Sequence, residues 1–211
     1  MTRKRIVCFD FETTGLDFLK DQPIEYAAVS IELDGTIKSI HGFVKFDGEL
    51  SDMVKQLTNL DIQTINTQGD TYDVAMTKLI EFIGIKEDIE INDTILVGHN
   101  MLNFDIHFLD LACAKLGYDI VNPNNYWDTA GCYKASKLNL IRNTNESISE
   151  FHRRALSTYA KGLKFKLPIV CEALGIDFKE DHRASSDTMA TLKVFQKQAT
   201  EFHSDFLELL K

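Results

Sequence analysis

Four acidic residues in three widely separated segments constrain the fold of this chain most strongly. Asp10 and Glu12 lie in the segment Phe9–Leu16, and Asp105 and Asp187 follow much later. Each acid stands beside small or apolar residues, and burying a lone carboxylate is costly. Clustered carboxylates become useful when hard divalent cations lie among them. We therefore expect the three segments to converge in one acidic metal site suited to phosphodiester chemistry.

The bulk composition predicts a single globular domain over residues 1–211, because 44% of the residues are hydrophobic and 26% are charged. The basic start Met1–Arg5 precedes the short apolar run Ile6–Phe9, which is too short for a signal peptide. No other run approaches the roughly 18 apolar residues of a membrane span. The four cysteines are widely spaced and form no metal or redox motif. These features predict free thiols and a cytoplasmic protein without a membrane partner.

The net charge of −9 argues against a polyanionic partner, but the charge is unevenly distributed. Residues 134–166 have a local charge of +6, and the remainder of the chain has −15. Two interpretations remain open: a solvated face, or a surface that grips a phosphate backbone while cations neutralise the acidic pocket. The basic residues are Lys134, Lys137, Arg142, Arg153, Arg154, Lys161, Lys164 and Lys166.

The apolar patterns predict an α/β fold with a mixed five-stranded sheet and helices on both faces. Asp34-Gly35 is a hairpin signal between two strand patterns, so the first three strands are expected to form an antiparallel meander. Later strands alternate with helices, which is typical of parallel pairing. The predicted strands cover residues 5–12, 24–33, 36–46, 94–97 and about 126–128, and the predicted helices 73–83, 104–116, 167–174 and 189–202.

The acids also have ordinary explanations when each is taken singly. Asp10 and Glu12 share one face of a strand and could touch one metal, although acids at a strand end are often simply exposed. Asp105 and Asp187 begin predicted helices, where the helix dipole already favours an acid. The nearby histidines favour a shared site. His182 precedes the last helix on a predicted loop, where it could act as a general base.

These residues resemble the signature of the DEDDh (DnaQ-like) 3′–5′ exonucleases. That family includes the DNA polymerase III epsilon subunit, RNase T, oligoribonuclease and the three-prime repair exonucleases. The resemblance extends from Asp10 to about Phe195 and includes Leu57–Leu60, which is similar to the family's Leu-Thr-Gly-Ile element. A sister branch has Tyr at the position of Arg183, so the segment His182–Asp187 favours the His branch. The resemblance implies a ribonuclease H-like fold.

The resemblance also implies a set of residue roles. Two divalent cations, Mg²⁺ or Mn²⁺, would be held by the four acids, with Asp105 acting partly through water. His182 would serve as general base for in-line attack of a metal-activated water, which releases 5′-mononucleotides. The residues matching those that hold the terminal nucleotide are Thr13, Thr14 and Leu16. The residues matching those that line the scissile end are His99, Asn100 and Phe104.

Two departures from the epsilon-type pattern shape the substrate predictions. Met101–Asn103 places three residues between Asn100 and Phe104, where the epsilon type has two, and this form is more similar to the repair exonucleases. Residues 129–166 form a longer segment than in compact members, and we interpret it as a basic insertion that grips substrate. Within it, the polar residues 139–150 are predicted to form a mobile substrate flap.

The leading hypothesis is a DNA exonuclease acting on single-stranded or mispaired 3′ ends. It would be either a freestanding repair or degradation enzyme or a proofreading subunit bound to a DNA polymerase. An exoribonuclease of the RNase T or oligoribonuclease type, and a non-catalytic nucleic-acid-binding module, are the alternatives. An apolar stripe near the end of the chain is predicted to pack on the core or to form a homodimer or polymerase contact. Its members are Phe202, Phe206, Leu209 and Leu210.

Overall fold

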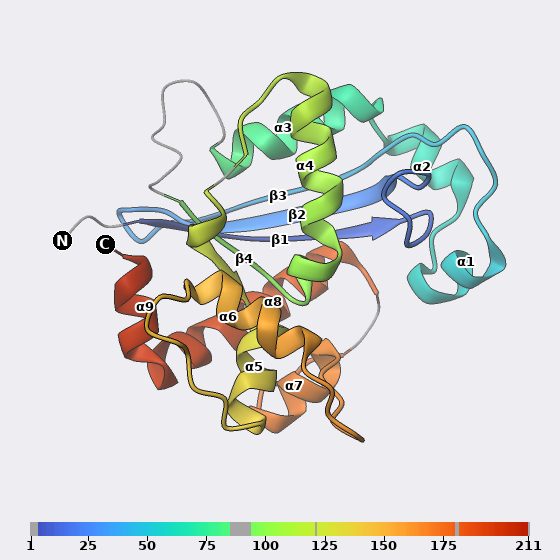
Figure 1. The fold of residues 1–211 in the computed structure, drawn as a ribbon. Helices are drawn as coiled ribbons and strands as arrows, with labels where there is room; N and C mark the ends of the chain where they lie inside the picture. Colours follow the sequence, from blue (N-terminus) through green and yellow to red (C-terminus); the bar gives the residue numbers. More distant parts are fainter. Residues whose placement is uncertain (1–3, 85–93, 121, 180–181, 211) are drawn as a thin grey trace.

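The computed structural model describes residues 4–84, 94–120, 122–179 and 182–210. A mixed five-stranded sheet in the order β3-β2-β1-β4-β5 forms its centre (Figure 1). The first three strands pair antiparallel, whereas β4 pairs parallel with β1 and β5 pairs parallel with β4. The predicted fold class is confirmed. The strands are β1 (Arg5–Thr13), β2 (Pro23–Ile31), β3 (Ile37–Phe43), β4 (Thr94–Gly98) and β5 (Tyr126–Asp128).

Helices cover both faces of the sheet, as predicted (Figure 1). The helices α1, α2, α5, α6 and α9 were not predicted from the sequence, and α8 begins at Ala184 rather than at residue 189. The α-helices are α1 (Asp52–Thr58), α2 (Ile62–Gln68), α3 (Tyr72–Ile83), α4 (Asp105–Leu116), α5 (Thr129–Lys137), α6 (Ile148–Ser157), α7 (Leu167–Ala173), α8 (Ala184–Glu201) and α9 (His203–Leu209). Two short 3-10 turns are η2 (Met101–Asn103) and η3 (Pro123–Asn125).

The strand β1 lies between two apolar layers because its side chains alternate between the faces of the sheet. Phe9 and Phe11 pack with Met76 of α3 and Phe108 of α4 in one core cluster. Cys8, on the opposite face, belongs to a second cluster that includes residues of β4, β5 and α8. A strand buried on both faces is held firmly, so its end is a rigid platform for functional groups.

The apolar stripe near the end of the chain packs on the second core cluster. Phe206 and Leu210 contact this cluster, Leu209 is buried within it, and the Phe206 ring lies edge-on to Phe195 at 5.7 Å between centroids. The prediction that the stripe packs on the core is therefore confirmed. Across the described ranges, no helix combines the length and apolar character needed to span a bilayer.

Candidate functional site

The end of β1 presents Asp10 and Glu12 on the same side of the sheet. Both side chains are partly buried, and Glu12 lies opposite Glu25 in the antiparallel register with β2. The intervening Phe11 points into the core on the opposite side. Because side chains alternate along the strand, the burial of Phe11 on one side leaves Asp10 and Glu12 together on the other.

The Asp105 side chain binds the backbone of β1 at a point that β4 does not pair with. The parallel pairing of β1 with β4 covers Arg5 to Cys8 only, so the next part of β1 extends past β4. There the Phe11 backbone N–H donates to Oδ1 of Asp105 at 3.2 Å. Asp105 is the first residue of α4 and is 4% exposed. Its carboxylate thus lies beside the backbone that separates Asp10 from Glu12.

The start of α8 supplies the remaining two groups. Asp187 lies in the first turn of this helix, and His182 precedes the helix with φ 48°, a left-handed backbone conformation. One potential ligand atom each from Glu12, His182 and Asp187 lie within 4.8 Å of one another. The structure therefore brings the end of β1 and the start of α8 together, as the sequence predicted.

The carboxylates perturb one another strongly. Burial, followed by the charges of Asp105, Glu12 and Asp187, raises the pKa of Asp10 well above its usual value. Burial and then the Asp187 charge raise the pKa of Glu12 to about 9, and burial raises that of Asp105 to about 7. Four acids held this closely repel one another unless protons or cations neutralise them. This all-oxygen carboxylate set fits hard divalent cations.

The loop after β1 contains a close contact between Gly15 and the Asp21 side chain. A Cβ at Gly15 would lie 2.5 Å from the Asp21 carboxylate, so glycine is needed for this contact. Asp21 accepts a hydrogen bond from the Thr14 hydroxyl at 2.9 Å, while the Thr13 hydroxyl donates to the Gly15 carbonyl. Leu16 is left 84% exposed at the surface. The two threonines therefore build the loop, and Leu16 is the member of this segment that is open to a ligand.

His99 links three elements near the site. Its Nε2 donates to the Phe165 carbonyl at 2.8 Å, and its Nδ1 lies 2.9 Å from the Thr129 hydroxyl. Burial lowers the pKa of His99 to about 4, so its ring is neutral near pH 7. Asn100 has φ 59° and accepts a hydrogen bond from Asn103. Both side chains are engaged within the protein, and their predicted contact with substrate stays a prediction.

Phe104 lies directly before α4 and is partly buried against Phe108, with 5.2 Å between ring centroids. Its ring packs against the core cluster that contains Phe9, Phe11 and Phe108. Its predicted role at the scissile end of a substrate also stays a prediction.

Sequence reasoning missed two buried acids that support the site. Asp128 is fully buried and accepts hydrogen bonds from the backbone N–H groups of Asn100, Leu102 and Gly131. It thereby holds the connection from β4 to α4. Glu25, also fully buried, lies on β2. The available signal was an acid within or directly after an apolar strand pattern.

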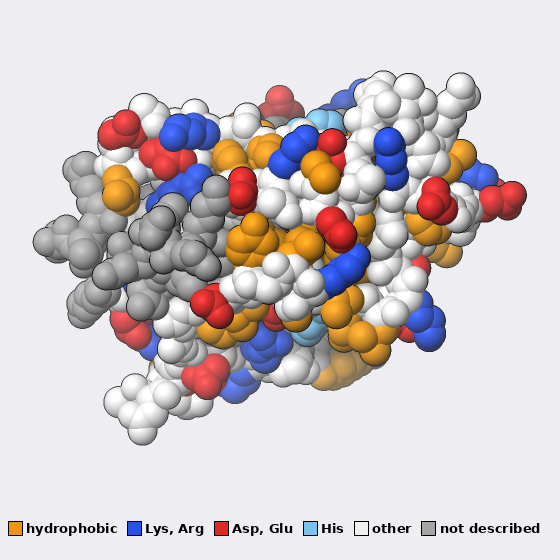
Figure 2. Space-filling model, turned by 90° about the horizontal axis from the view of Figure 1, so that it is seen from above, with side chains coloured by type: hydrophobic (Ala, Val, Ile, Leu, Met, Phe, Trp, Pro, Cys, Tyr) orange, Lys and Arg blue, Asp and Glu red, His pale blue; other side chains and the backbone are white. Residues whose placement is uncertain are grey.

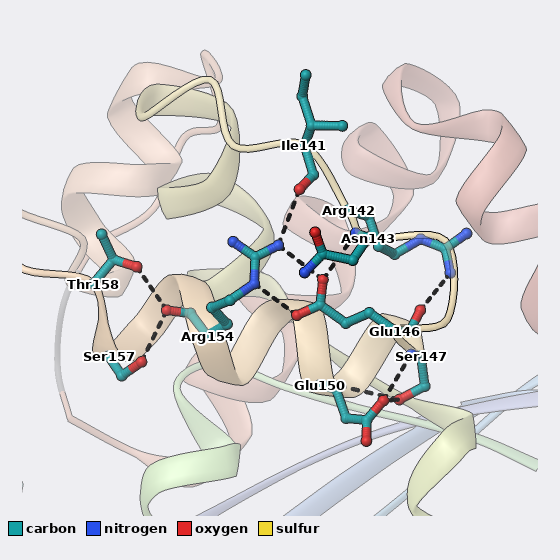
Figure 3. Close-up of polar contacts among 9 residues, drawn as sticks. All are labelled: Ile141, Arg142, Asn143, Glu146, Ser147, Glu150, Arg154, Ser157 and Thr158. Atoms are coloured by element: carbon teal, nitrogen blue, oxygen red, sulfur yellow. Dashed lines mark hydrogen bonds and ion pairs between the residues drawn. The ribbon is translucent and has the colours of Figure 1, made fainter.

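The basic segment at residues 134–166 is largely occupied with structural contacts. Arg154 forms an ion pair with Glu146 at 2.7 Å and also donates to the Ile141 carbonyl, as Figure 3 shows. Arg142 donates to the Glu146 carbonyl and pairs with Glu208 of α9. Both arginines are therefore engaged within the protein, and the interpretation of residues 129–166 as a substrate-gripping insertion stays a prediction.

Lys134 is buried and donates to the Leu156 carbonyl, so it is not available to substrate either. The predicted flap at residues 139–150 is likewise tied down by Glu146, and its last three residues begin α6. Ser147 and Glu150 form a capping box there, which explains the helix start. The exposed lysines that remain in the segment are Lys137, Lys161, Lys164 and Lys166.

Figure 2 shows the face covered by α3 and α4, which is the upper side in Figure 1. Acidic and basic side chains are interspersed there with apolar ones. Among the described residues on this face, no continuous basic surface is present. The α3 and α4 face therefore lacks the electrostatic footprint typical of nucleic-acid binding.

Together, the mixed sheet and the converging carboxylates with an adjacent histidine define a class of metal-dependent hydrolytic enzymes. Residues 7–195 match the model of a protein family described as exonuclease. The chain belongs to this exonuclease family.

Known sequences and solved structures agree with this assignment. A DNA polymerase III PolC-type protein of Thermotoga maritima is 30% identical over 206 residues, which is 97% of this chain and 12% of the relative. The corresponding Ureaplasma parvum protein is 28% identical and is covered to 12%. The chain thus spans about an eighth of the length of these relatives.

A zinc-bound complex of E. coli exonuclease I with single-stranded DNA superposes with a TM-score of 0.74 at 17% identity. The match covers 97% of this chain and 42% of that protein. A second complex of exonuclease I, with a dT13 oligonucleotide, gives 0.71 at 18% identity and the same coverages. At these identities, the structural matches support the fold.

Proposed function

We propose that this protein is a metal-dependent 3′–5′ exonuclease that removes 5′-mononucleotides from single-stranded or mispaired DNA ends. The observation that carries the proposal is the convergence of Asp10, Glu12, Asp105 and Asp187 with His182 beside them. Family membership supplies the reaction class. The relatives named as DNA polymerases and the exonuclease I complexes with DNA favour DNA as substrate.

The four carboxylates would hold two divalent cations, Mg²⁺ or Mn²⁺. Bound cations supply charge neutralisation at the scissile phosphate and lower the pKa of the attacking water. The hydrogen bond from the Phe11 N–H holds Asp105 beside the strand that carries Asp10 and Glu12. Because the folded chain positions the acids beforehand, little reorganisation is needed when cations and substrate bind.

His182 would accept the proton of the attacking water at a ring nitrogen. Its position within 4.8 Å of Glu12 and Asp187 places the imidazole next to the carboxylates that would hold the cations. Histidine exchanges protons near neutral pH, which suits a general base. The exposed Leu16 would contact the terminal nucleotide, with Thr13 and Thr14 setting the loop that presents it.

The single strand would leave the site along residues 159–166. This segment contacts His99, which is predicted to line the scissile end, through the Phe165 carbonyl. It presents the 86% exposed Tyr159 together with Lys161, Lys164 and Lys166. Aromatic and basic groups in one segment can stack bases and pair with phosphates. The gripping surface is therefore proposed to be this shorter segment.

Cellular context is part of the proposal. The similarity to polymerase sequences supports a proofreading role, with a freestanding repair or degradation enzyme as the second possibility. The four cysteines are free and buried, which supports a reducing cytoplasm. A DNA polymerase is the protein partner that the relatives suggest, and a homodimer is the alternative.

A gel time course of purified protein tests the function. The substrates are 5′-labelled single-stranded DNA, an end-mismatched duplex and single-stranded RNA, each with Mg²⁺ or with chelator. Stepwise shortening from the 3′ end is expected with Mg²⁺ and DNA, and none with chelator or with Asp10→Ala. Asp34→Ala, in the distant β2–β3 turn, is the matched control and should retain activity. Faster shortening of RNA would assign an exoribonuclease instead, and no shortening of any substrate would contradict the proposal.

A further inference from the structure

A buried carboxylate outside the proposed metal set lies directly beneath the start of α8. Glu25 is fully buried on β2, opposite Glu12 in the strand register. The guanidinium of Arg183 engages both of its oxygens, with Nε at 3.1 Å from each and Nη2 at 2.8 Å from Oε1. A buried carboxylate requires such compensation, and the planar guanidinium fixes direction as well as distance.

Two further groups hold this pair in place. The Nε2 atom of His41 on β3 lies 2.6 Å from Oε1 of Glu25. The Arg183 guanidinium lies over the Phe43 ring at 5.7 Å from its centroid. Residues of two neighbouring strands, β2 and β3, therefore hold the Arg183 side chain at the start of α8.

Arg183 immediately follows His182, whose backbone has the left-handed φ of 48°. A residue other than glycine keeps this conformation only where its surroundings hold it. Arg183 is the N-cap residue of α8, and its side chain, which has no acceptor and so cannot cap the helix, donates to Glu25 instead. The ion pair thus anchors the backbone from which the His182 imidazole extends.

We propose that Glu25 is a positioning residue that sets the His182 imidazole through Arg183. The inference rests on the proposed function, because it explains how His182, the proposed general base, is held in position. Both Glu25 oxygens are engaged by Arg183, so Glu25 supports the site without serving as a cation ligand.

Arg183→Met and Glu25→Gln test the proposal through single-turnover cleavage of labelled single-stranded DNA. Each change should lower the maximal rate by about 10- to 100-fold, because small misplacements of a catalytic group have effects of this size. The DNA concentration for half-maximal rate and the affinity for Mn²⁺ should change little. In a His182→Ala background, neither change should lower the rate further, because the affected group is already absent.

The chain offers a matched control at the opposite end of the same strands. Arg5 on β1 pairs with Glu32 at 3.0 Å, and both side chains are mostly buried. Arg5→Met should affect thermal stability and leave the cleavage rate unchanged. Glu25→Gln keeps the side-chain shape and removes the buried charge, so it should fold even if Arg183→Met, which leaves the buried Glu25 carboxylate without its guanidinium, does not. Circular dichroism and thermal melts establish folding for every variant.

A readout independent of cleavage separates this inference from the proposed function. The His182 imidazole signals in histidine-labelled protein are assigned by their loss in His182→Ala. They should shift or broaden in Glu25→Gln and in Arg183→Met, and stay unchanged in Arg5→Met. Unchanged His182 signals, an unchanged rate, or an equal further loss of rate in the His182→Ala background would each overturn the positioning role. A wild-type protein that cleaves no substrate would instead refute the proposed function, and the imidazole signals would still decide the positioning.

Discussion

At the scale of single residues, the Asp105 carboxylate accepts a backbone hydrogen bond that a neighbouring strand would otherwise accept. The backbone of β1 extends past the end of its pairing with β4, and the Asp105 carboxylate accepts the Phe11 N–H there. This hydrogen bond satisfies the backbone and simultaneously brings the third acid to the first two. One contact therefore links the stability of the end of β1, the central strand, to the assembly of the site.

His182→Ala is expected to slow the chemical step about 100- to 10,000-fold, the usual contribution of a general base. DNA binding and Mn²⁺ binding should persist because the four carboxylates remain. Single-turnover cleavage, together with equilibrium binding of a labelled oligonucleotide, separates these two effects. Replacing His107, a histidine on α4 that is outside the acidic cluster, provides the control. Full activity of His182→Ala would remove this residue from the mechanism.

The acids of the site could be predicted from the sequence because their spacing resembles a known signature. Glu25 and Asp128 stand within or at the end of apolar strand patterns, which indicates burial, but their supporting roles could not be predicted because these depend on their partners. Those partners lie far along the chain: Arg183 for Glu25, and the Asn100 and Leu102 backbones for Asp128. Local sequence patterns carry no information about such pairings.

At the scale of elements, the number of basic residues in a segment did not indicate how many of their charges are exposed at the surface. Arg154 is paired with Glu146, and Lys134 is buried. The prediction of a gripping insertion treated all of these cations alike. The helix α6 was missed for a related reason, because its polar start reads as a loop unless the capping box is recognised.

Replacing Lys161, Lys164 and Lys166 together by glutamine should weaken binding of single-stranded DNA. The salt dependence should also fall, by up to about 2 in the slope of log K against log salt, since each lost phosphate contact accounts for about 0.7. Fluorescence anisotropy at several salt concentrations measures both quantities. A control with the exposed residues Lys38, Lys193 and Lys197 changed in the same way has the same net charge. Equal weakening in both variants would show that only overall charge matters.

At the scale of the whole molecule, the fold class could be predicted because the meander and the later strands have clear apolar patterns. The strand order, with β1 in the centre, depends on long-range pairing of β1 with β4. The apolar stripe of α9 also illustrates the limit of sequence patterns. Its apolar spacing favours a core contact but is also compatible with an interface, and its position against Phe195 shows the core contact.

The acidic cluster should make the stability of the metal-free protein fall as the pH rises. In the folded state the pKa is raised to about 9 for Glu12 and to about 7 for Asp105, whereas unfolded carboxyl groups titrate near 4. The folded protein thus binds more protons than the unfolded chain between about pH 4 and pH 9. The unfolding free energy decreases across that window.

Thermal melts in chelator at pH 5, 7 and 9 measure this effect, and the melting temperature should fall by several degrees over the series. Added Mn²⁺ should restore stability most at pH 9, where the acids are least protonated. Glu12→Gln should reduce the pH dependence because one of the titrating groups is removed. A pH dependence that is identical in wild type and Glu12→Gln would contradict this account.

The site joins β1 (Arg5–Thr13) to the start of α8 (Ala184–Glu201), two elements that lie far apart along the sequence. A ribosome therefore synthesises β1 and most of the other elements before it adds His182 and Asp187. Incomplete nascent chains, and fragments cut before α8, cannot assemble the acidic cluster. The full set of site residues is therefore present only in a chain that contains both β1 and the start of α8, and a cut anywhere between them separates Asp10 and Glu12 from His182 and Asp187.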